Sequence, residues 1–276
     1  MIRAAALAAL LALGGCGASA PPPALREGRP LRIVSVNPCI DAVLMRVADP
    51  GQIAAISAYS HDPRATSIPL AQARRFAAID GSAEAIVALR PDLVLASGSL
   101  TPATSAALAR LGIRKVELGL PQSIVDSEAQ VRDIARAVGH PERGEALAAE
   151  MAAAVVAARA PGAPVPALIW EGGGLVPALG TLPDEMLRTA GFANQAATYG
   201  LRNWDQLPLE RLVARPPQVL LTPPGAARDD RLLGHPVLRR LRTRIAVRDF
   251  PERLLFCGGP TIIDALARLR TVRASL

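Results

Sequence analysis

The sequence predicts an α/β protein of two Rossmann-like lobes with mostly parallel sheets, joined by one long rigid α-helix. The segments Glu84–Leu95 and Glu210–Leu221 repeat one pattern: a glutamate and helically spaced apolar residues precede a proline and an apolar run. Throughout residues 31–140 and 163–276, apolar runs of strand length alternate with helical patterns, as in open parallel sheets. Between these two lobes, residues 141–162 are rich in alanine and predict the connecting helix.

Each copy of the repeat is expected to form a short helix followed by a buried strand. A proline ends each helix, and the strands are expected at Leu93–Ala96 and Val219–Leu221. Glu84 and Glu210 fall in the first turns of their helices, where the helix dipole favours a carboxylate. Either residue alone is explained by that charge effect. Their matched positions in the two copies favour a shared, outward-facing role.

The remaining elements continue the alternation. Each predicted strand is a short apolar run, and each predicted helix has apolar residues at helical spacing. Because a helix separates most successive strands, neighbouring strands are expected to run parallel. The strands are expected at residues 32–36, 53–56, 115–118, 167–170 and 254–256, and the helices at residues 41–47, 102–111, 124–138 and 262–273.

The first residues predict export. A basic Arg3 precedes an apolar stretch over Ala4–Leu13, which is too short to span a bilayer as a helix but suits the core of a signal peptide. The following Gly14-Gly15-Cys16 completes a pattern that resembles the bacterial lipobox, so residues 1–16 are expected to be a signal ending at a lipidated Cys16. An ordinary cleavage near residues 18–20 is the alternative. Residues 17–30 are expected to be a proline-rich linker between membrane and domain.

The composition agrees with an exported protein whose lobes have hydrophobic cores of modest size. Half of the residues are hydrophobic, and no segment after the leader is long and apolar enough to cross a membrane. The formal charge of +7 comes almost wholly from arginine, since Lys115 is the one lysine. The arginines are scattered and are not interleaved with aromatic residues, which argues against nucleic-acid binding.

A ligand cleft is expected where loops follow the carboxyl ends of the strands, because open α/β sheets hold their ligands there. Glu171 stands at such an end beside three glycines, which would let backbone amides approach a ligand closely. Glu171 could instead cap the loop, and a ligand-facing role is favoured. The glycines lack the Gly-x-Gly-x-x-Gly order of a dinucleotide site. The ligand-binding candidates are Cys39, Tyr59, His61, Trp170, Glu171, Trp204 and Cys257.

Cys39 and Cys257 allow three interpretations. With Cys16 lipidated, two thiols are left in an oxidising compartment, and both lie in expected cleft loops, one from each lobe. They could form a disulfide across the cleft, bind a soft metal or a metal-centred ligand as thiolates, or be two small buried residues. The distance between their Cα atoms decides, because a separation beyond about 7 Å excludes a disulfide without backbone movement.

Enzymatic chemistry is not predicted. No Gly-x-Ser-x-Gly elbow is present, and two of the three histidines, His140 and His235, fall in apparent loops at helix boundaries. A zinc or manganese site would need clustered histidines and carboxylates, which the sequence does not show. We therefore expect a binding protein without a metal centre or cofactor of its own.

Taken together, these features resemble the substrate-binding proteins of bacterial ABC importers for cobalamin and ferric siderophores. The Tyr59-Ser60 loop, the first repeat, the long helix and the second repeat occur in that order over residues 31–276. The resemblance implies two lobes that move little, with a ligand cleft between them. It also implies a monomeric, lipid-anchored periplasmic protein that captures a corrinoid or a ferric chelate and delivers it to a two-fold membrane permease.

The resemblance assigns roles to individual residues. In this family one glutamate on each lobe forms salt bridges with arginines of the permease, and Glu84 and Glu210 match those positions. Tyr59 and Trp204 fall where aromatic contacts to a ring are expected, and Trp170 lies close to another such position. Other expected aromatics are missing, since Ile79 and Ser97 stand near positions that carry tryptophan in the cobalamin binder. Cobalamin and ferric siderophores are therefore about equally favoured. The alternative function is an exported scaffold or interaction lipoprotein that carries no solute.

Overall fold

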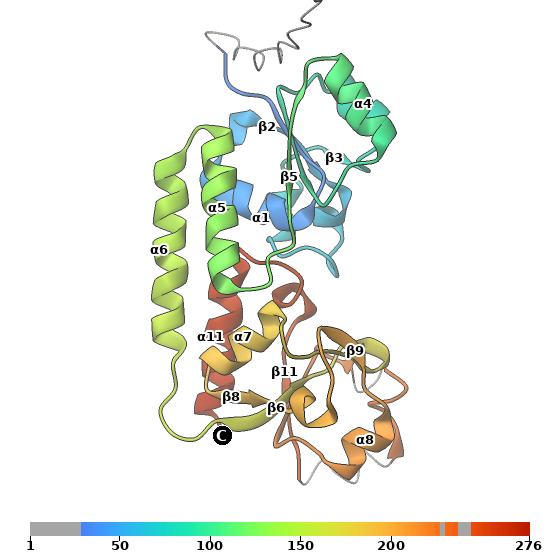
Figure 1. The fold of residues 1–276 in the computed structure, drawn as a ribbon, viewed down its shortest axis with the longest axis vertical. Coiled ribbons are helices and arrows are strands. Elements are labelled where there is room, and N and C mark those ends of the chain that lie inside the picture. The colour runs from blue at the N-terminus through green and yellow to red at the C-terminus, as the bar shows by residue number, and fades with distance from the viewer. Residues whose placement is uncertain (1–28, 227–229, 237–243) are drawn as a thin grey trace, which may run out of the picture.

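The computed structural model describes residues 29–226, 230–236 and 244–276, which form two lobes stacked along the long axis of the molecule (Figure 1). The predicted signal peptide with Cys16, and most of the linker at residues 17–30, lie outside the described residues. Within the described ranges, no helix combines the length and the apolar character needed to cross a bilayer.

The N-terminal lobe is a five-stranded parallel sheet in the order β3-β2-β1-β4-β5. Alternate residues of its central strands face opposite layers: Ile33 packs with α1 and α5, whereas Val34 packs with α3 and α4. The strands are β1 (Ile33–Ser35), β2 (Ile53–Ser57), β3 (Ala78–Ile79), β4 (Leu93–Ser97) and β5 (Arg114–Leu118). The helices are α1 (Pro38–Val47), η1 (Pro50–Gln52), η2 (Ala58–His61), α2 (Leu70–Ala73), α3 (Ala83–Ala88), α4 (Pro102–Arg110) and α5 (Ile124–Val138).

The C-terminal lobe has a four-stranded parallel sheet in the order β11-β10-β6-β8 and a small antiparallel pair, β7 with β9. Its strands are β6 (Val165–Ile169), β7 (Leu175–Pro177), β8 (Phe192–Asn194), β9 (Trp204–Gln206), β10 (Val219–Thr222) and β11 (Ala246–Asp249). The helices are η3 (Gly172–Gly174), α7 (Leu182–Thr189), η4 (Gln195–Tyr199), α8 (Leu209–Ala214), η5 (Glu252–Leu254) and α11 (Thr261–Ala274).

The two copies of the repeat occupy equivalent places in the two sheets. In the N-terminal lobe α3 leads into β4, which pairs with β1 and β5. In the C-terminal lobe α8 leads into β10, which pairs in the same way with β6 and β11. The predicted fold of two α/β lobes with mostly parallel sheets is therefore confirmed.

The connecting helix α6 (Pro141–Ala158) runs beside both lobes (Figure 1) and packs against α5, α1 and α11. At Gly144 the helix α5 comes so close that an added Cβ would lie 2.5 Å from the Cβ of Ala135. One hydrophobic cluster contains Met151 of α6 together with Ile33 of the first sheet and Ile169 of the second. The lobes therefore share a core along the connecting helix.

One predicted strand is wrong. Residues 254–256 do not form a strand; η5 ends there, and the last strand is β11, eight residues earlier in the chain. Leu254 and Leu255 are apolar because they are buried in the core shared with α11. Strand β11 lies at the edge of its sheet, and its half-buried and exposed residues alternate. Because it contains the polar Arg248 and Asp249, it does not form the apolar run by which the other strands were predicted.

Filling the space at Gly144 is expected to destabilise the protein, although alanine is the better helix former. Gly144→Ala should lower the free energy of unfolding by about 1–3 kcal/mol, because the new methyl group overlaps Ala135 and the helix pair must move apart. Urea unfolding followed by circular dichroism measures this. Gly51→Ala is the control, since an added Cβ there has no heavy atom within 4 Å. Equal stability of both variants would show that α5 and α6 can separate freely.

Candidate functional site

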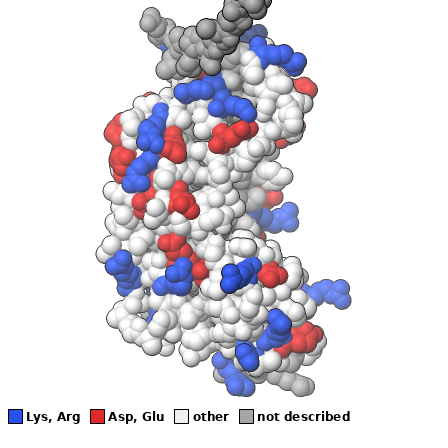
Figure 2. All heavy atoms as spheres, in the orientation of Figure 1, with Lys and Arg blue, Asp and Glu red and all other residues white. Residues whose placement is uncertain are grey.

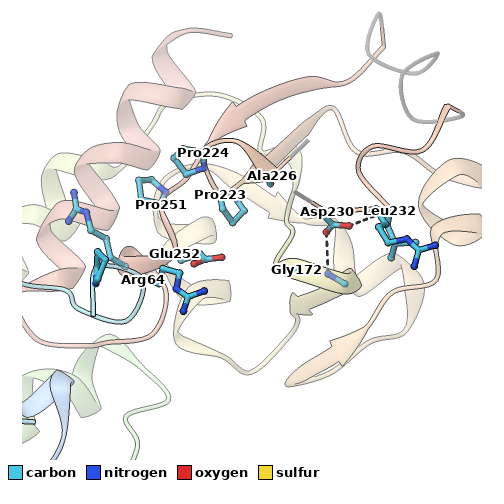
Figure 3. Close-up of a pocket in the computed structure, with 13 residues that line it drawn as sticks. Arg64, Gly172, Pro223, Pro224, Ala226, Asp230, Leu232, Pro251 and Glu252 are labelled. Atoms are coloured by element: carbon cyan, nitrogen blue, oxygen red, sulfur yellow. Dashed lines mark hydrogen bonds between the residues drawn. The ribbon is translucent and has the colours of Figure 1, made fainter. Parts of the chain in front are cut away.

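A pocket of about 680 Å³ opens between the two lobes (Figure 3). Its N-terminal wall comes from the loop that follows η2, and its C-terminal wall from the loops after β6, β10 and β11. These loops follow the carboxyl ends of parallel strands, where the fold places a ligand. The pocket is lined by Pro63, Arg64, Gly172, Gly173, Pro223, Pro224, Ala226, Asp230, Arg231, Leu232, Pro251, Glu252 and Arg253.

Three exposed aromatic side chains stand near the lining residues of this pocket: Tyr59 and Phe256 in the chain, and Trp204 through its contact with Phe256. Tyr59 of η2 is 66% exposed, and Trp204 of β9 and Phe256 after η5 are 36% and 45% exposed. Trp204 stacks on Phe256, with ring centroids 6.5 Å apart and an interplanar angle of 23°. Exposed aromatic faces of this kind suit a flat, apolar ligand. The sequence reasoning missed Phe256, because it was assigned to a buried strand.

A disulfide joins the lobes next to these aromatics. Cys39 of α1 and Cys257 are bonded, with their Cα atoms 4.9 Å apart. Gly259, two residues after Cys257, also fits tightly against the N-terminal lobe. Its amide donates to the Ser127 hydroxyl at 2.6 Å, and a Cβ on Gly259 would lie 2.8 Å from Val43. Of the three interpretations of the cysteines, the structure contains the disulfide. Phe256 is thereby held at the boundary between the lobes.

Asp41, which sequence reasoning did not single out, orders the loop that carries Tyr59. It lies in the first turn of α1 and is fully buried. Its Oδ2 accepts hydrogen bonds from the Ser57 amide at 3.0 Å and from the Ser60 hydroxyl at 2.6 Å, on either side of Tyr59. Burial raises the pKa of Asp41 from 3.8 to about 7, and Oδ1 has no hydrogen-bond partner in the described part of the chain. In the sequence, the position of Asp41 among the apolar residues of a predicted helix is the one sign that it is buried.

Glu171 is a second buried carboxyl, at the carboxyl end of β6. It is 5% exposed, and its Oε1 has no hydrogen-bond partner among the residues described. Burial, and then the charge of Glu252 on the pocket wall, raise the pKa of Glu171 to about 7. The side chain therefore lies close to the pocket, and Gly172 and Gly173, which follow it, line the pocket directly.

One predicted ligand contact, Trp170, needs correction, and a second, His61, makes a contact within its own lobe. Trp170 is completely buried in the core of the C-terminal lobe, where its Nε1 donates to Asp230 at 2.7 Å, so its ring does not face the cleft. His61 is half-buried, and its Nε2 lies 3.1 Å from the carbonyl oxygen of Ala73, which ties η2 to α2 within the same lobe. Successive side chains of an extended segment point to opposite sides. Trp170 therefore points into the core, and Glu171 points the other way.

Glu84 and Glu210 occupy matching sites in the first turns of α3 and α8. Both are exposed, and no hydrogen bond or ion pair joins either carboxylate to another described residue. On the face drawn in Figure 2, acidic and basic side chains are interspersed. In the described ranges, no three histidine, cysteine or acidic residues group together in a way that could hold a metal ion.

Comparison with known proteins gives one family and one fold. A sequence profile of the family described as periplasmic binding protein matches residues 33–246, most of the chain. No curated protein matches the chain by sequence. Among solved structures, the periplasmic heme-binding protein RhuT from Roseiflexus sp. RS-1 in apo form is 25% identical, with a TM-score of 0.68 over 89% of this chain and 100% of that chain.

Two structures from Vibrio cholerae share the fold at lower identity. The periplasmic heme-binding protein HutB is 16% identical, with a TM-score of 0.73, and the match covers 88% of this chain and 98% of that one. The periplasmic vitamin B12 binding protein BtuF is 20% identical, with a TM-score of 0.68, over 88% of this chain and 96% of that one.

Replacing Asp41 is expected to flatten the pH dependence of stability. Because the folded protein holds the Asp41 proton more tightly than the unfolded chain, the free energy of unfolding should fall as the pH rises from 3.8 to about 7, and then level off. For Asp41 alone the loss from pH 5 to pH 8 should be about 2 kcal/mol. In Asp41→Asn this contribution disappears, and only that of Glu171, which has the same sign, is left.

Urea unfolding at the two pH values measures this difference. Asp133→Asn, which changes an exposed carboxylate of α5, is the control and should keep the wild-type slope. An unchanged slope in Asp41→Asn would mean that Asp41 is ionised in the folded protein at pH 5.

Proposed function

Because the chain belongs to the periplasmic binding protein family, we propose that it is the solute-binding component of an ABC importer that captures a flat metal chelate between its lobes. The family consists of binding proteins rather than enzymes and implies a periplasmic location. The observation that carries the proposal is the interlobe pocket together with three exposed aromatics close to its lining residues. Tyr59 precedes Pro63 and Arg64 in the chain, and Phe256, on which Trp204 stacks, follows Arg253 by three residues.

The ligand class follows from this surface. Aromatic faces stack on flat conjugated rings, and the described residues contain no metal-ligating cluster that would hold a bare ion. A corrinoid or heme satisfies both conditions, and a ferric siderophore satisfies the second. RhuT and HutB are heme-binding proteins and BtuF binds vitamin B12, which supports a tetrapyrrole-type ligand for the same fold. The pocket of about 680 Å³ is large enough to take a major part of such a molecule.

Delivery to the permease is assigned to Glu84 and Glu210. They lie at equivalent positions of two similar lobes, and neither carboxylate is engaged with another described residue. A matched pair of charges suits a two-fold membrane partner, since ion pairs at an interface set orientation and association rate. We also propose that the mature chain is anchored through a lipid on Cys16, which lies outside the described residues.

Ligand binding is expected to change the fluorescence of Trp204, because it is the exposed tryptophan at the cleft whereas Trp170 is buried. A titration with cyanocobalamin, a ferric hydroxamate, a ferric catecholate and hemin should give a saturable response to one of them. Trp204→Ala should weaken that binding by about tenfold or more, as expected for loss of an aromatic anchor worth roughly 2 kcal/mol. Calorimetry measures the affinity of this variant.

Val156→Ala is the matched control, because Val156 is an equally apolar, exposed side chain on α6 away from the pocket. It should bind the ligand as the wild type does. If the fluorescence of the wild type responds to none of the four ligands, the scaffold function is favoured instead.

Reversing both docking charges is expected to abolish uptake while leaving ligand binding intact. Glu84→Arg with Glu210→Arg replaces two attractive contacts to permease arginines by two repulsive ones. Uptake of the bound chelate by cells or by permease in proteoliposomes measures this. The control is Glu142→Arg with Glu150→Arg, which makes the same change of net charge on α6. Full uptake with the first pair would refute the docking assignment.

A further inference from the structure

Glu171 is unusual in its surroundings. Its side chain is almost completely buried, its Oε1 has no hydrogen-bond partner among the described residues, and no ion pair balances it there. Leaving such a group buried and unpaired is costly. The aromatic surface and the disulfide do not account for it.

A second carboxyl lies beside it. Glu252 begins η5 on the pocket wall, close enough for its charge to raise the pKa of Glu171. No hydrogen bond or ion pair joins the Glu252 side chain to a described residue either. Figure 3 shows the Glu252 carboxyl directed into the pocket, with Arg64 nearby. The wall at this point therefore presents the Glu252 carboxyl, and the buried Glu171 carboxyl lies next in the chain to the lining residues Gly172 and Gly173.

The pocket arginines do not reverse this character. Three arginines line the pocket, and each has an acidic residue near it in space or in the chain. Arg64 is highly exposed and lies 3.8 Å from Asp62, the guanidinium of Arg253 lies 4.0 Å from Asp264, and Arg231 follows Asp230, which also lines the pocket. Exposed pairs of this kind are largely screened by water, whereas a buried carboxyl is not. A ligand group that reaches Glu171 therefore meets a carboxyl that is shielded from water, whereas the ion pairs of Arg64 and Arg253 are exposed to it.

On the basis of the proposed function, we propose that Glu171, supported by Glu252, recognises an uncharged carboxamide on the ligand. The structure therefore favours a chelate edged with carboxamides over one edged with carboxylates.

The hydrogen-bonding groups of the two partners are complementary. A neutral carboxyl has one O–H donor and one carbonyl acceptor, and a primary carboxamide has N–H donors and one carbonyl acceptor, so the two can form a paired set of hydrogen bonds. A ligand carboxylate at the same place would meet two acidic side chains and gain only repulsion when they are ionised. Burial of Glu171, which disfavours its charged form, is consistent with the neutral partner.

The ligand must then bind together with a proton whenever Glu171 is ionised. A ligand that covers the pocket removes more water from Glu171 and holds its proton more tightly, so affinity should fall as the pH rises above about 7. The Glu171→Gln side chain has the shape and the donor and acceptor of the neutral acid, and should bind without this dependence. The charged groups that line the pocket around Glu171 are Arg64, Asp230, Arg231, Glu252 and Arg253.

Calorimetric titrations with cyanocobalamin, which carries carboxamides, and with hemin, which carries two carboxylates, test the proposal on the mature protein at pH 6 and pH 8.5. The wild type should bind cyanocobalamin more tightly than hemin. Its affinity for cyanocobalamin should be about tenfold weaker at the higher pH, with proton uptake visible in buffers of different ionisation enthalpy. Glu171→Gln should bind cyanocobalamin equally at both pH values, with the wild-type affinity of pH 6.

Glu142→Gln, an exposed change on α6, is the control and should keep the wild-type pH dependence. Thermal unfolding of each variant checks that it is folded. Cyanocobalamin binding that is independent of pH in the wild type overturns the proposal. Tighter binding of hemin, or of a ferric siderophore alone, also overturns it but leaves the importer function standing. Binding of no chelate at all overturns both.

Discussion

The junction between α1 and the segment before α11 fixes the position of the cleft residues. There the Cys39–Cys257 disulfide, the hydrogen bond from Gly259 to Ser127 and the contact of Gly259 with Val43 join one lobe to the other within a few residues. Phe256 is adjacent to this junction in the chain, and Glu252 is only five residues before Cys257. A bulkier residue than glycine at position 259 would need both α1 and the backbone at φ +62° to adjust.

The lobes are also held together away from this junction. Each sheet buries one face against the helices next to α6, and these faces join in one hydrophobic cluster that runs from Ile33 to Val272. A second bond from the Ser67 hydroxyl to the Arg253 carbonyl, at 2.9 Å, crosses the cleft near the pocket. Opening the lobes would therefore expose apolar core and break polar contacts together. The energy of the fold opposes large movements of the cleft walls.

Much of this organisation could be predicted from the sequence, since it depends on periodicity. Apolar runs and helical spacing located the connecting helix and the repeats, and the end of α5 at Val138, before Gly139, coincides with its prediction. Side-chain directions at strand ends could not be predicted in this way. Trp170 and Glu171 are neighbours, and a single residue of register decides which one is buried in the core.

Contacts between distant segments were equally hidden. Asp41 supports Ser57 and Ser60, sixteen and nineteen positions later, and the disulfide spans 218 positions. Phe256 lies in an apolar stretch of three residues, Leu254 to Phe256, of which two are buried and one is exposed. All three are large apolar residues, so residue type does not distinguish the exposed one. The turn at η5, which begins after Pro251, directs Leu254 and Leu255 into the core and leaves Phe256 exposed.

A cleft held this firmly must select its ligand by groups already in place, because it gains little by closing around the ligand. Fixed aromatic faces provide affinity for many flat rings without distinguishing among them. Discrimination then depends on buried polar groups, since an unmatched one is costly in a water-poor site. Asp41 and Glu171 both lower the stability of the folded protein at neutral pH, because burial raises the pKa of each. Asp41 compensates by ordering the Tyr59 loop. Glu171 has no such role in the described structure, and the proposed contact with a ligand would give a reason for its place beside the pocket-lining Gly172 and Gly173.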